Sequence, residues 1–206
     1  MTTDTVDPIR TFVTPTTWAQ AQLKHVDELL LEQAHLEKKA AAGAVTFLFR
    51  VPCESKLHRR LSSLAREELV HYERSLRLLA ARGVAFERQT SSGYAERLKK
   101  AVRKDTADRL VDELLVGALI ERRSHERMSL LATALVDREP EVSRFYADLC
   151  PAEDRHEDLY IDLAILANDG RCVQARYQQL ADHEAQVLAE LPFLPRLHSG
   201  LPDVGA

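Results

Sequence analysis

A repeated set of acidic and histidine residues on apolar helical seams restricts the fold of this chain more than any other feature. In the first half, a glutamate is followed after a long gap by a Glu-x-x-His motif, and the second half repeats this order with a similar gap. The residues concerned are Glu37, Glu68, His71, Glu121, Glu153 and His156. A chain that buries all of them needs four helices that face a common centre.

Each of these residues falls on the inward seam of its predicted helix rather than on the water-facing side. In heptad spacing, Glu37 lies between Leu30 and Ala44, and Glu121 follows Leu114. Each Glu-x-x-His motif takes two successive inward positions on its own seam. Because an ordinary surface helix turns glutamate and histidine toward water, this placement predicts buried polar residues in the middle of a helical bundle.

Four buried carboxylates need compensation, because an isolated ionised group strongly resists transfer out of water. Two divalent cations would balance them, and the i, i+3 spacing within each Glu-x-x-His motif puts both side chains on one helix face. One Glu on each of two helices plus Glu-x-x-His on each of two others is the ligand set of di-iron carboxylate bundles. Mixed carboxylate and imidazole ligation suits iron or manganese rather than structural zinc. The six residues are therefore predicted to bind two metal ions.

A third Glu-x-x-His motif, formed by Glu32 and His35, shows that the spacing alone does not define a ligand. Both residues fall off the seam, and the matching positions in the second half are Val116 and Leu119. We therefore assign Glu32 and His35 to a solvated helix face. Other acidic or histidine residues off the seam are expected at the surface or behind the ligands: Glu67, Glu73, His125 and Glu126.

Tyr160 lies one turn beyond His156 on the inward stripe of the same helix. A phenol at this position can hydrogen-bond a ligand or a bound oxygen species. A buried tyrosine is more often a packing residue with its hydroxyl satisfied. Tyr160 is therefore a candidate catalytic residue behind the metal ligands, with core packing as the alternative.

Hydrophobic periodicity and helix-end residues predict five helices. They cover residues 18–49, 54–81, 106–136, 140 to a stop at 168–170, and 171–189. Thr16 or Thr17 is expected to cap the first helix, and Asp105 or Thr106 the third. The connection over 82–105 is long and contains a short helical piece, which is typical of a crossover. We predict an all-α, ferritin-like four-helix bundle with a long crossover connection and an additional C-terminal helix, in a single domain over residues 1–206.

The composition narrows the possible partners and location. A total of 28 Lys and Arg against 32 Asp and Glu gives a net charge of −4, so a nucleic-acid partner would have to meet a local basic patch. The three cysteines form no Cys-x-x-Cys and are predicted to be reduced thiols. No segment approaches the roughly 20 apolar residues of a membrane span, and the chain begins without a signal-peptide pattern. We expect a cytoplasmic protein with no membrane partner.

Several segments resemble the tRNA 2-methylthio-N6-isopentenyladenosine hydroxylase family, usually called MiaE. They are residues 35–41, 64–71, 114–124 and the tail Arg196-Leu197-His198-Ser199-Gly200. The likeness extends from the first helix to the tail, and all six ligand positions are filled. The tail differs from the family's Arg-Phe-His-Ser-Gly only by Leu197 in place of Phe, which is not expected to affect the metal site.

The resemblance implies an oxygen-dependent monooxygenase that hydroxylates the isopentenyl group of the modified adenosine beside the anticodon of certain tRNAs. It also implies two iron ions held by the six residues, O2 as co-substrate, and two electrons from an external reductase. Two alternatives stay open: another di-iron oxidase or hydroxylase that acts on a small molecule, and a non-enzymatic iron-binding bundle. The sequence does not indicate the oligomeric state.

The acidic total charge is at odds with a tRNA partner, since phosphate contacts dominate the affinity for nucleic acid. The long connection offers a local basic cluster: Lys99, Lys100, Arg103 and Lys104. This cluster is a candidate tRNA contact, with a solvated helix face as the alternative.

Overall fold

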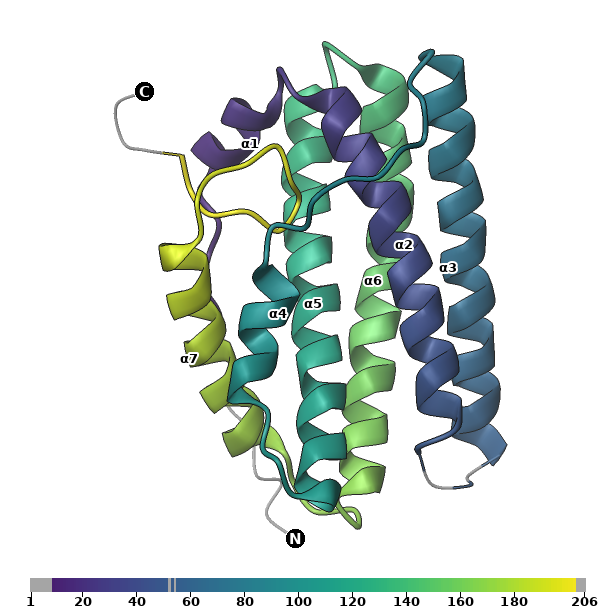
Figure 1. The fold of residues 1–206 in the computed structure, drawn as a ribbon, viewed down its shortest axis with the longest axis vertical. Helices are drawn as coiled ribbons and strands as arrows, with labels where there is room; N and C mark the ends of the chain where they lie inside the picture. The colour runs from purple at the N-terminus through teal and green to yellow at the C-terminus, as the bar shows by residue number, and fades with distance from the viewer. Residues whose placement is uncertain (1–8, 52, 54, 203–206) are drawn as a thin grey trace, which may run out of the picture.

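The structure is a computed structural model that describes residues 9–51, 53 and 55–202, and the regular elements in this part of the chain are all helical (Figure 1). They are α1 (Thr16–Gln22), α2 (Val26–Leu48), α3 (Ser55–Ala81), α4 (Tyr94–Leu98), the 3-10 helix η1 (Lys99–Ala101), α5 (Thr106–Leu135), α6 (Pro140–Ala167) and α7 (Gln174–Glu190). None of the described helices is both long and apolar enough to cross a membrane.

The four long helices α2, α3, α5 and α6 form the bundle. Helix α2 packs along α3, and α5 packs along α6, so each half of the chain contributes one helical hairpin (Figure 1). The segment from Arg82 to Asp105 leaves the end of α3, runs back along the outside of the bundle through α4 and η1, and enters α5 at the opposite end. This connectivity confirms the predicted ferritin-like bundle with a crossover. Helix α7 confirms the additional C-terminal helix.

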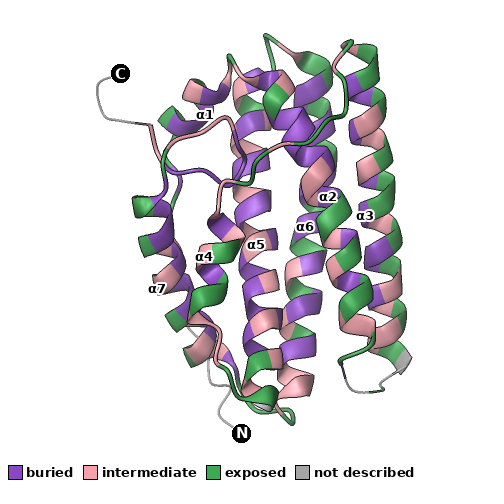
Figure 2. Ribbon diagram, viewed as in Figure 1, coloured by how far each residue is buried: buried purple, intermediate pink, exposed green. Residues whose placement is uncertain are grey.

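The buried apolar side chains form two clusters, one toward each end of the bundle. One cluster includes Leu64, Leu114 and Leu163, and the other includes Leu30 and Leu149. On all four long helices, the predicted ligands lie in sequence between the members of these two clusters. Figure 2 shows the buried faces of the helices turned toward the bundle interior. The fold therefore places a polar layer between two apolar layers.

The prediction of one continuous helix over residues 18–49 is wrong, because α1 ends at Gln22 and α2 begins at Val26. The break lets α1 lie across the end of the bundle, where the Gln22 amide donates to the carbonyl oxygens of Leu194 (2.8 Å) and Arg196 (3.2 Å). Contacts with the C-terminal tail thus override the local helical pattern.

The remaining helix ends agree with the sequence within a few residues. Thr16 and Thr17 are not the cap, because the residue before α1 is Pro15 and no side chain caps that end. Asp105 is the N-cap residue of α5, although its side chain makes no capping hydrogen bond. Helix α7 begins at Gln174, after a turn in which Gly170 has a positive φ of 74°. Glu54, where the second helix was expected to begin, lies outside the described residues.

The segment after α7 forms a closed loop against the bundle, which we call the tail loop (residues 191–200). The amide of Gly200 donates to the carbonyl oxygen of Pro192 at 3.0 Å. A Cβ atom at Gly200 would lie 1.7 Å from the carbonyl oxygen of Leu191, so only glycine fits this closure. Most of the loop is buried, and it lies beside α1 and α4 at one side of the bundle (Figure 1).

Candidate metal centre

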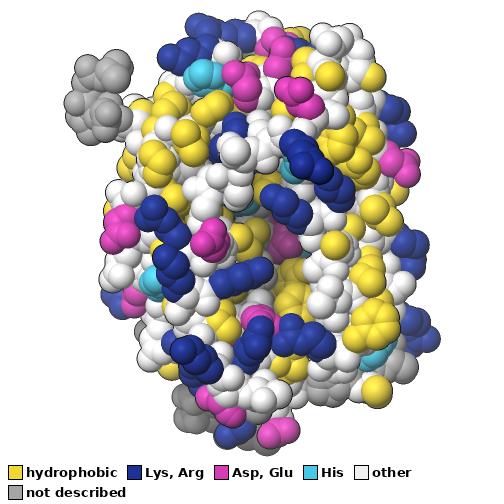
Figure 3. All heavy atoms as spheres, viewed as in Figure 1, with side chains coloured by type: hydrophobic (Ala, Val, Ile, Leu, Met, Phe, Trp, Pro, Cys, Tyr) yellow, Lys and Arg dark blue, Asp and Glu magenta, His cyan; other side chains and the backbone are white. Residues whose placement is uncertain are grey.

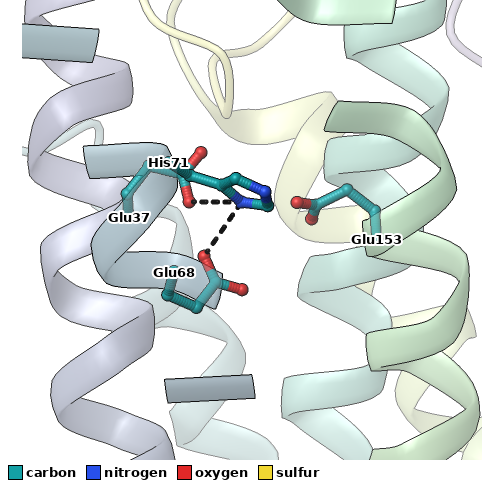
Figure 4. Close-up of side chains that lie close together, drawn as sticks. All are labelled: Glu37, Glu68, His71 and Glu153. Atoms are coloured by element: carbon teal, nitrogen blue, oxygen red, sulfur yellow. Dashed lines mark ion pairs between the residues drawn. The ribbon is translucent and has the colours of Figure 1, made fainter. Parts of the chain in front are cut away.

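The six predicted ligands come together in one buried layer of the bundle. Glu37 lies on α2, Glu121 on α5, and the two Glu-x-x-His pairs on α3 and α6. Each of the six residues is at most 6% exposed. Figure 4 shows four of these side chains, from α2, α3 and α6, directed toward one another. Heptad placement on four separate helices is therefore sufficient to bring the six residues to one point.

Within this layer, the ligand atoms form two overlapping groups, each within 4.8 Å. The first group contains Glu37, Glu68, His71 and Glu153, and the second contains Glu68, Glu121, Glu153 and His156. Glu68 and Glu153 belong to both groups, whereas each remaining residue belongs to one. This is the arrangement of two adjacent metal positions with two shared carboxylates and, at each position, one further carboxylate and one imidazole.

The imidazoles mark the two ends of the centre. The Nδ1 atom of His71 lies 3.7 Å from Glu37 Oε2 and 3.8 Å from Glu68 Oε2. The Nδ1 atom of His156 lies 2.8 Å from Glu68 Oε1. The two rings are separated by 6.4 Å between centroids. Each imidazole therefore faces carboxylate oxygens of its own group.

Several polar atoms in this layer lack a hydrogen-bond partner among the described residues, although they are fully enclosed. They include Glu68 Oε1, His71 Nδ1 and His156 Nδ1. The 2.8 Å approach of His156 to Glu68 is an ion-pair distance without the orientation of a hydrogen bond. Buried polar atoms without partners are costly, and carboxylate oxygens and imidazole nitrogens are atom types that bind metal ions. The donor set therefore fits a pair of cations.

The charges in the layer lead to the same conclusion. Burial raises the pKa of Glu68 well above its usual range, and the adjacent Glu37 raises it further. Burial likewise raises the pKa of Glu153, with a further contribution from Glu121. Burial also acts on Glu37, but the adjacent Glu68 and His71 side chains lower its pKa overall. Neighbouring carboxyl groups thus retain protons that divalent cations would replace.

Two polar side chains support the ligands from behind. The Gln33 amide donates to Glu37 Oε1 at 2.6 Å. Glu67 Oε2 lies 3.2 Å from His156 Nε2, and Glu67 is itself paired with Arg155. Such partners fix the orientation of a ligating side chain. Glu67 thus fits the expected position behind the ligands, whereas the role of Gln33 was not predicted.

The other residues expected at the surface or behind the ligands belong neither to the two ligand groups nor to the lining of the adjoining cavity. Glu73 pairs with Arg77 at 3.8 Å, and both side chains are mostly exposed. His125 pairs with Asp154 at 2.6 Å. Glu126 accepts hydrogen bonds from Thr14 and is paired with Arg123.

A cavity of about 550 Å³ leads to the centre between α2, α4 and α5. Its lining includes the carboxylates of Glu37, Glu68, Glu121 and Glu153. Figure 3 shows a hollow on this face with hydrophobic walls, acidic side chains inside and basic side chains around it. The basic residues of the lining are Lys39, Arg50, Lys99 and Arg109, which we call the basic rim. A molecule that enters from solvent thus passes basic side chains before it reaches the carboxylates.

Tyr160 lines the same cavity and is 3% exposed. Its ring packs edge-on against Phe47, with 5.7 Å between centroids. A Cβ atom at Gly117 would lie 3.2 Å from the tyrosine ring, so glycine at this position leaves room for it. Burial raises the pKa of the Tyr160 phenol well above its usual range, which keeps the hydroxyl protonated. Its catalytic role stays a prediction.

The basic cluster of the long connection divides into two kinds of residue. Lys99, Lys100 and Lys104 are exposed, and Lys99 belongs to the basic rim. Arg103 instead forms ion pairs with Asp108 (2.7 Å) and with the buried Asp112 (2.7 Å). Arg103 therefore has a structural role, and the tRNA contact stays a prediction for the cluster.

The assignment of Glu32 to a solvated face is wrong, because its side chain is only 5% exposed. Its carboxylate accepts a hydrogen bond from the backbone amide of Leu197 in the tail loop. His35, by contrast, is half-buried and hydrogen-bonded to the carbonyl oxygen of Glu87 at 2.8 Å. Neither partner could be recognised from the local sequence, since Leu197 is 165 residues from Glu32 and Glu87 is 52 residues from His35.

Glu32 makes stability depend on pH. Burial raises its pKa from an ordinary value of 4.5 to about 7, despite the bond from Leu197. The folded state therefore holds more protons than the unfolded state between these values, and stability falls as the pH rises through this window. The free energy of unfolding should fall by on the order of 3 kcal/mol between pH 4.5 and pH 7, and we expect Glu32→Gln to remove this fall. Urea unfolding of both proteins across this range measures the difference, and parallel pH profiles would contradict the assignment.

The fold and this buried cluster define the class: a ferritin-like four-helix bundle whose Glu and His side chains are compatible with a di-iron site. The chain belongs to the tRNA-(MS2IO6A)-hydroxylase (MiaE) family, whose sequence model matches residues 2–199.

Two curated relatives carry the name tRNA 2-(methylsulfanyl)-N(6)-isopentenyladenosine(37) hydroxylase. The relative from Pseudomonas putida is 37% identical over 196 residues, which cover 92% of this chain and 91% of the relative. The relative from Salmonella typhimurium is 35% identical over 156 residues, or 75% of this chain. The match covers 56% of the Salmonella protein, so this chain corresponds to about half of that relative's length.

A solved structure is also similar to this chain. It is described as Protein 43 with aldehyde deformylating oxygenase activity from Synechococcus, with a TM-score of 0.83 and 39% sequence identity. The match covers 96% of this chain and 100% of the Synechococcus chain.

Proposed function

We propose that this protein is an O2-dependent di-iron monooxygenase that hydroxylates the isopentenyl group of 2-methylthio-N6-isopentenyladenosine in tRNA. The observation that carries the proposal is the convergence of six Glu and His residues, in two overlapping groups, at a cavity of a MiaE-family chain. The names of the curated relatives support the substrate. A cytoplasmic location and an external reductase belong to the same proposal.

In this proposal, Glu37, Glu68, His71, Glu121, Glu153 and His156 would hold two iron ions, and Glu68 and Glu153 belong to both ligand groups. When bound, the iron pair supplies the activation of O2, which side chains alone do not provide. The chain positions the substrate in the cavity and keeps the reacting region away from bulk water. Tyr160 and Phe47 provide an apolar wall that suits a branched hydrocarbon.

The Synechococcus protein favours a second candidate function, oxygenase activity on an aldehyde. Its sequence identity to this chain is similar to that of the Pseudomonas relative. An apolar wall beside a metal centre suits the hydrocarbon part of an aldehyde as well as an isopentenyl group. The basic rim favours tRNA, since a neutral aldehyde gains nothing from cationic side chains at the entrance.

Parallel reactions distinguish the two candidates. Iron-loaded protein is supplied with O2 and a reductase system, and with either modified tRNA or a long-chain aldehyde. We expect hydroxylated isopentenyladenosine after nuclease digestion and mass spectrometry of the tRNA, and little conversion of the aldehyde. Aldehyde conversion with unchanged tRNA would replace the proposed substrate.

The basic rim gives a prediction for tRNA binding. Lys39 and Lys99 are exposed at the cavity, whereas Arg50 and Arg109 are both paired with Glu113. We expect the double variant Lys39→Ala, Lys99→Ala to weaken tRNA binding and to reduce the slope of log affinity against log salt by roughly 1 to 2. Filter binding over a salt series measures both effects.

A matched control uses Arg77→Ala, which removes an exposed cation from α3, outside the lining of this cavity. We expect its affinity and salt slope to remain those of the unmodified protein. Equal losses in the control and in the double variant would mean that tRNA responds to total charge rather than to the basic rim.

A further inference from the structure

We propose that His198, in the tail loop, contacts the purine ring of the substrate and determines specificity for a heteroaromatic group in the cavity. This inference rests on the proposed tRNA function and adds a residue that recognises the modified base. It follows from the position of the imidazole, from the ring nitrogen left for a ligand, and from the way the tail loop is held.

His198 lines the same cavity as the carboxylates of Glu37 and Glu121, although it comes from the far end of the chain. The residue is 3% exposed. Its Nε2 atom lies 3.2 Å from the hydroxyl of Ser124, one turn from Glu121 on α5. Its ring stacks on Tyr94, with 4.7 Å between centroids and 6° between planes. One face and one nitrogen of the imidazole are thus fixed by the protein.

The imidazole is neutral, because burial and the nearby cations Arg127 and Arg123 hold the pKa of His198 well below its usual value. A neutral imidazole has one N–H donor and one acceptor nitrogen. Since Ser124 engages Nε2, the Nδ1 atom is the ring nitrogen available to a ligand. The complementary group is an uncharged heteroatom, such as a purine nitrogen, rather than a phosphate.

Buried charged side chains hold the backbone on both sides of His198. The Arg127 guanidinium, which is fully buried, donates to the carbonyl oxygens of Leu197 (2.6 Å) and Ser199 (2.7 Å). Glu32 accepts the amide hydrogen of Leu197. Burying charges is costly unless they are well paired. An anchored loop of this kind presents its side chain to the cavity in one fixed position.

The two ends of the cavity differ in chemistry on either side of the carboxylates. Ser124 and His198 provide polar groups toward one end, whereas Gly117, Phe47 and Tyr160 form an apolar wall toward the other. A heteroaromatic ring at His198 would therefore place an attached hydrocarbon beside the carboxylates. An aliphatic aldehyde offers only one carbonyl oxygen to this nitrogen and has no heteroaromatic ring to place beside the imidazole.

The test compares two RNA probes on the metal-free protein. One is an anticodon stem-loop that contains 2-methylthio-N6-isopentenyladenosine, and the other has unmodified adenosine at the same position. We expect His198→Phe, which keeps an aromatic ring on Tyr94 but removes the ring nitrogens, to weaken binding of the modified stem-loop about fivefold to tenfold, the effect of one hydrogen bond. Binding of the unmodified stem-loop, which uses outer contacts only, should change less than about twofold.

The control is His183→Phe, a half-buried histidine on α7 whose Nε2 bonds to the carbonyl oxygen of Arg97 outside this cavity lining. It should bind both probes as the unmodified protein does. If His198→Phe does not unfold cooperatively, His198→Leu provides the same comparison. If a folded His198 variant keeps the same preference for the modified stem-loop, the inference is overturned. If the protein without any substitution shows no preference between the two stem-loops, the proposed function itself is overturned.

Discussion

Glu68→Gln is expected to prevent binding of the metal pair and to lower tRNA hydroxylation by about a hundredfold or more. Glu68 belongs to both ligand groups, so a neutral amide removes a charged oxygen ligand from both metal positions. Anaerobic titration with ferrous iron measures the stoichiometry, and the tRNA assay measures the rate. Full iron binding by the variant would exclude Glu68 as a shared ligand.

The same variant tests whether Glu68 is needed for metal binding or for packing of the buried layer. Glutamine has nearly the same volume, and removing an ionisable group from a buried layer relieves a desolvation cost. We therefore expect the metal-free variant to unfold with a free energy equal to or up to about 1 kcal/mol above that of the unmodified protein. The control Glu73→Gln, which changes an exposed residue of the same helix, should alter neither iron binding nor stability.

Arg127→Ala is expected to lower the free energy of unfolding by about 3 kcal/mol or more, measured by urea denaturation. The guanidinium is 0% exposed, holds two carbonyl oxygens of the tail loop, and lies 4.6 Å from the centroid of the Trp18 ring. Alanine leaves those oxygens without a donor and removes one of the cations near Glu32. The tail loop should therefore detach from the bundle.

A neighbouring arginine provides the comparison. Arg122 is about one-third exposed and pairs with Glu157 at 3.0 Å. Because partly exposed ion pairs contribute little, Arg122→Ala should lower stability by less than about 1 kcal/mol. Equal and small losses for both variants would show that the buried guanidinium does not hold the tail loop.

The bundle and the six-residue cluster were predictable because both depend on local periodicity. A glutamate such as Glu37 on an apolar seam has to face the interior of the bundle once its helix packs. The i, i+3 pairs Glu68/His71 and Glu153/His156 then meet those glutamates with no further information. The long connection also indicated the crossover, because it has to return from one end of the bundle to the other.

The tail loop and its partners were not predictable in the same way. Glu32 lies off the seam, yet it is buried because it bonds to Leu197, 165 residues away. The break between α1 and α2 has the same origin, since Gln22 turns toward the tail loop. Such contacts depend on where the last segment of the chain lies. The sequence likewise does not reveal that Arg103 is paired with the buried Asp112.

The most direct measurement for the central claim is the source of the oxygen atom in the product. Iron-loaded protein, reductase and modified tRNA are incubated under isotopically labelled dioxygen, and the nucleosides are analysed by mass spectrometry. The proposed monooxygenase predicts one labelled oxygen atom in the isopentenyl group, and no product with Glu68→Gln. Absence of hydroxylated nucleoside from iron-loaded, reduced protein would contradict the account.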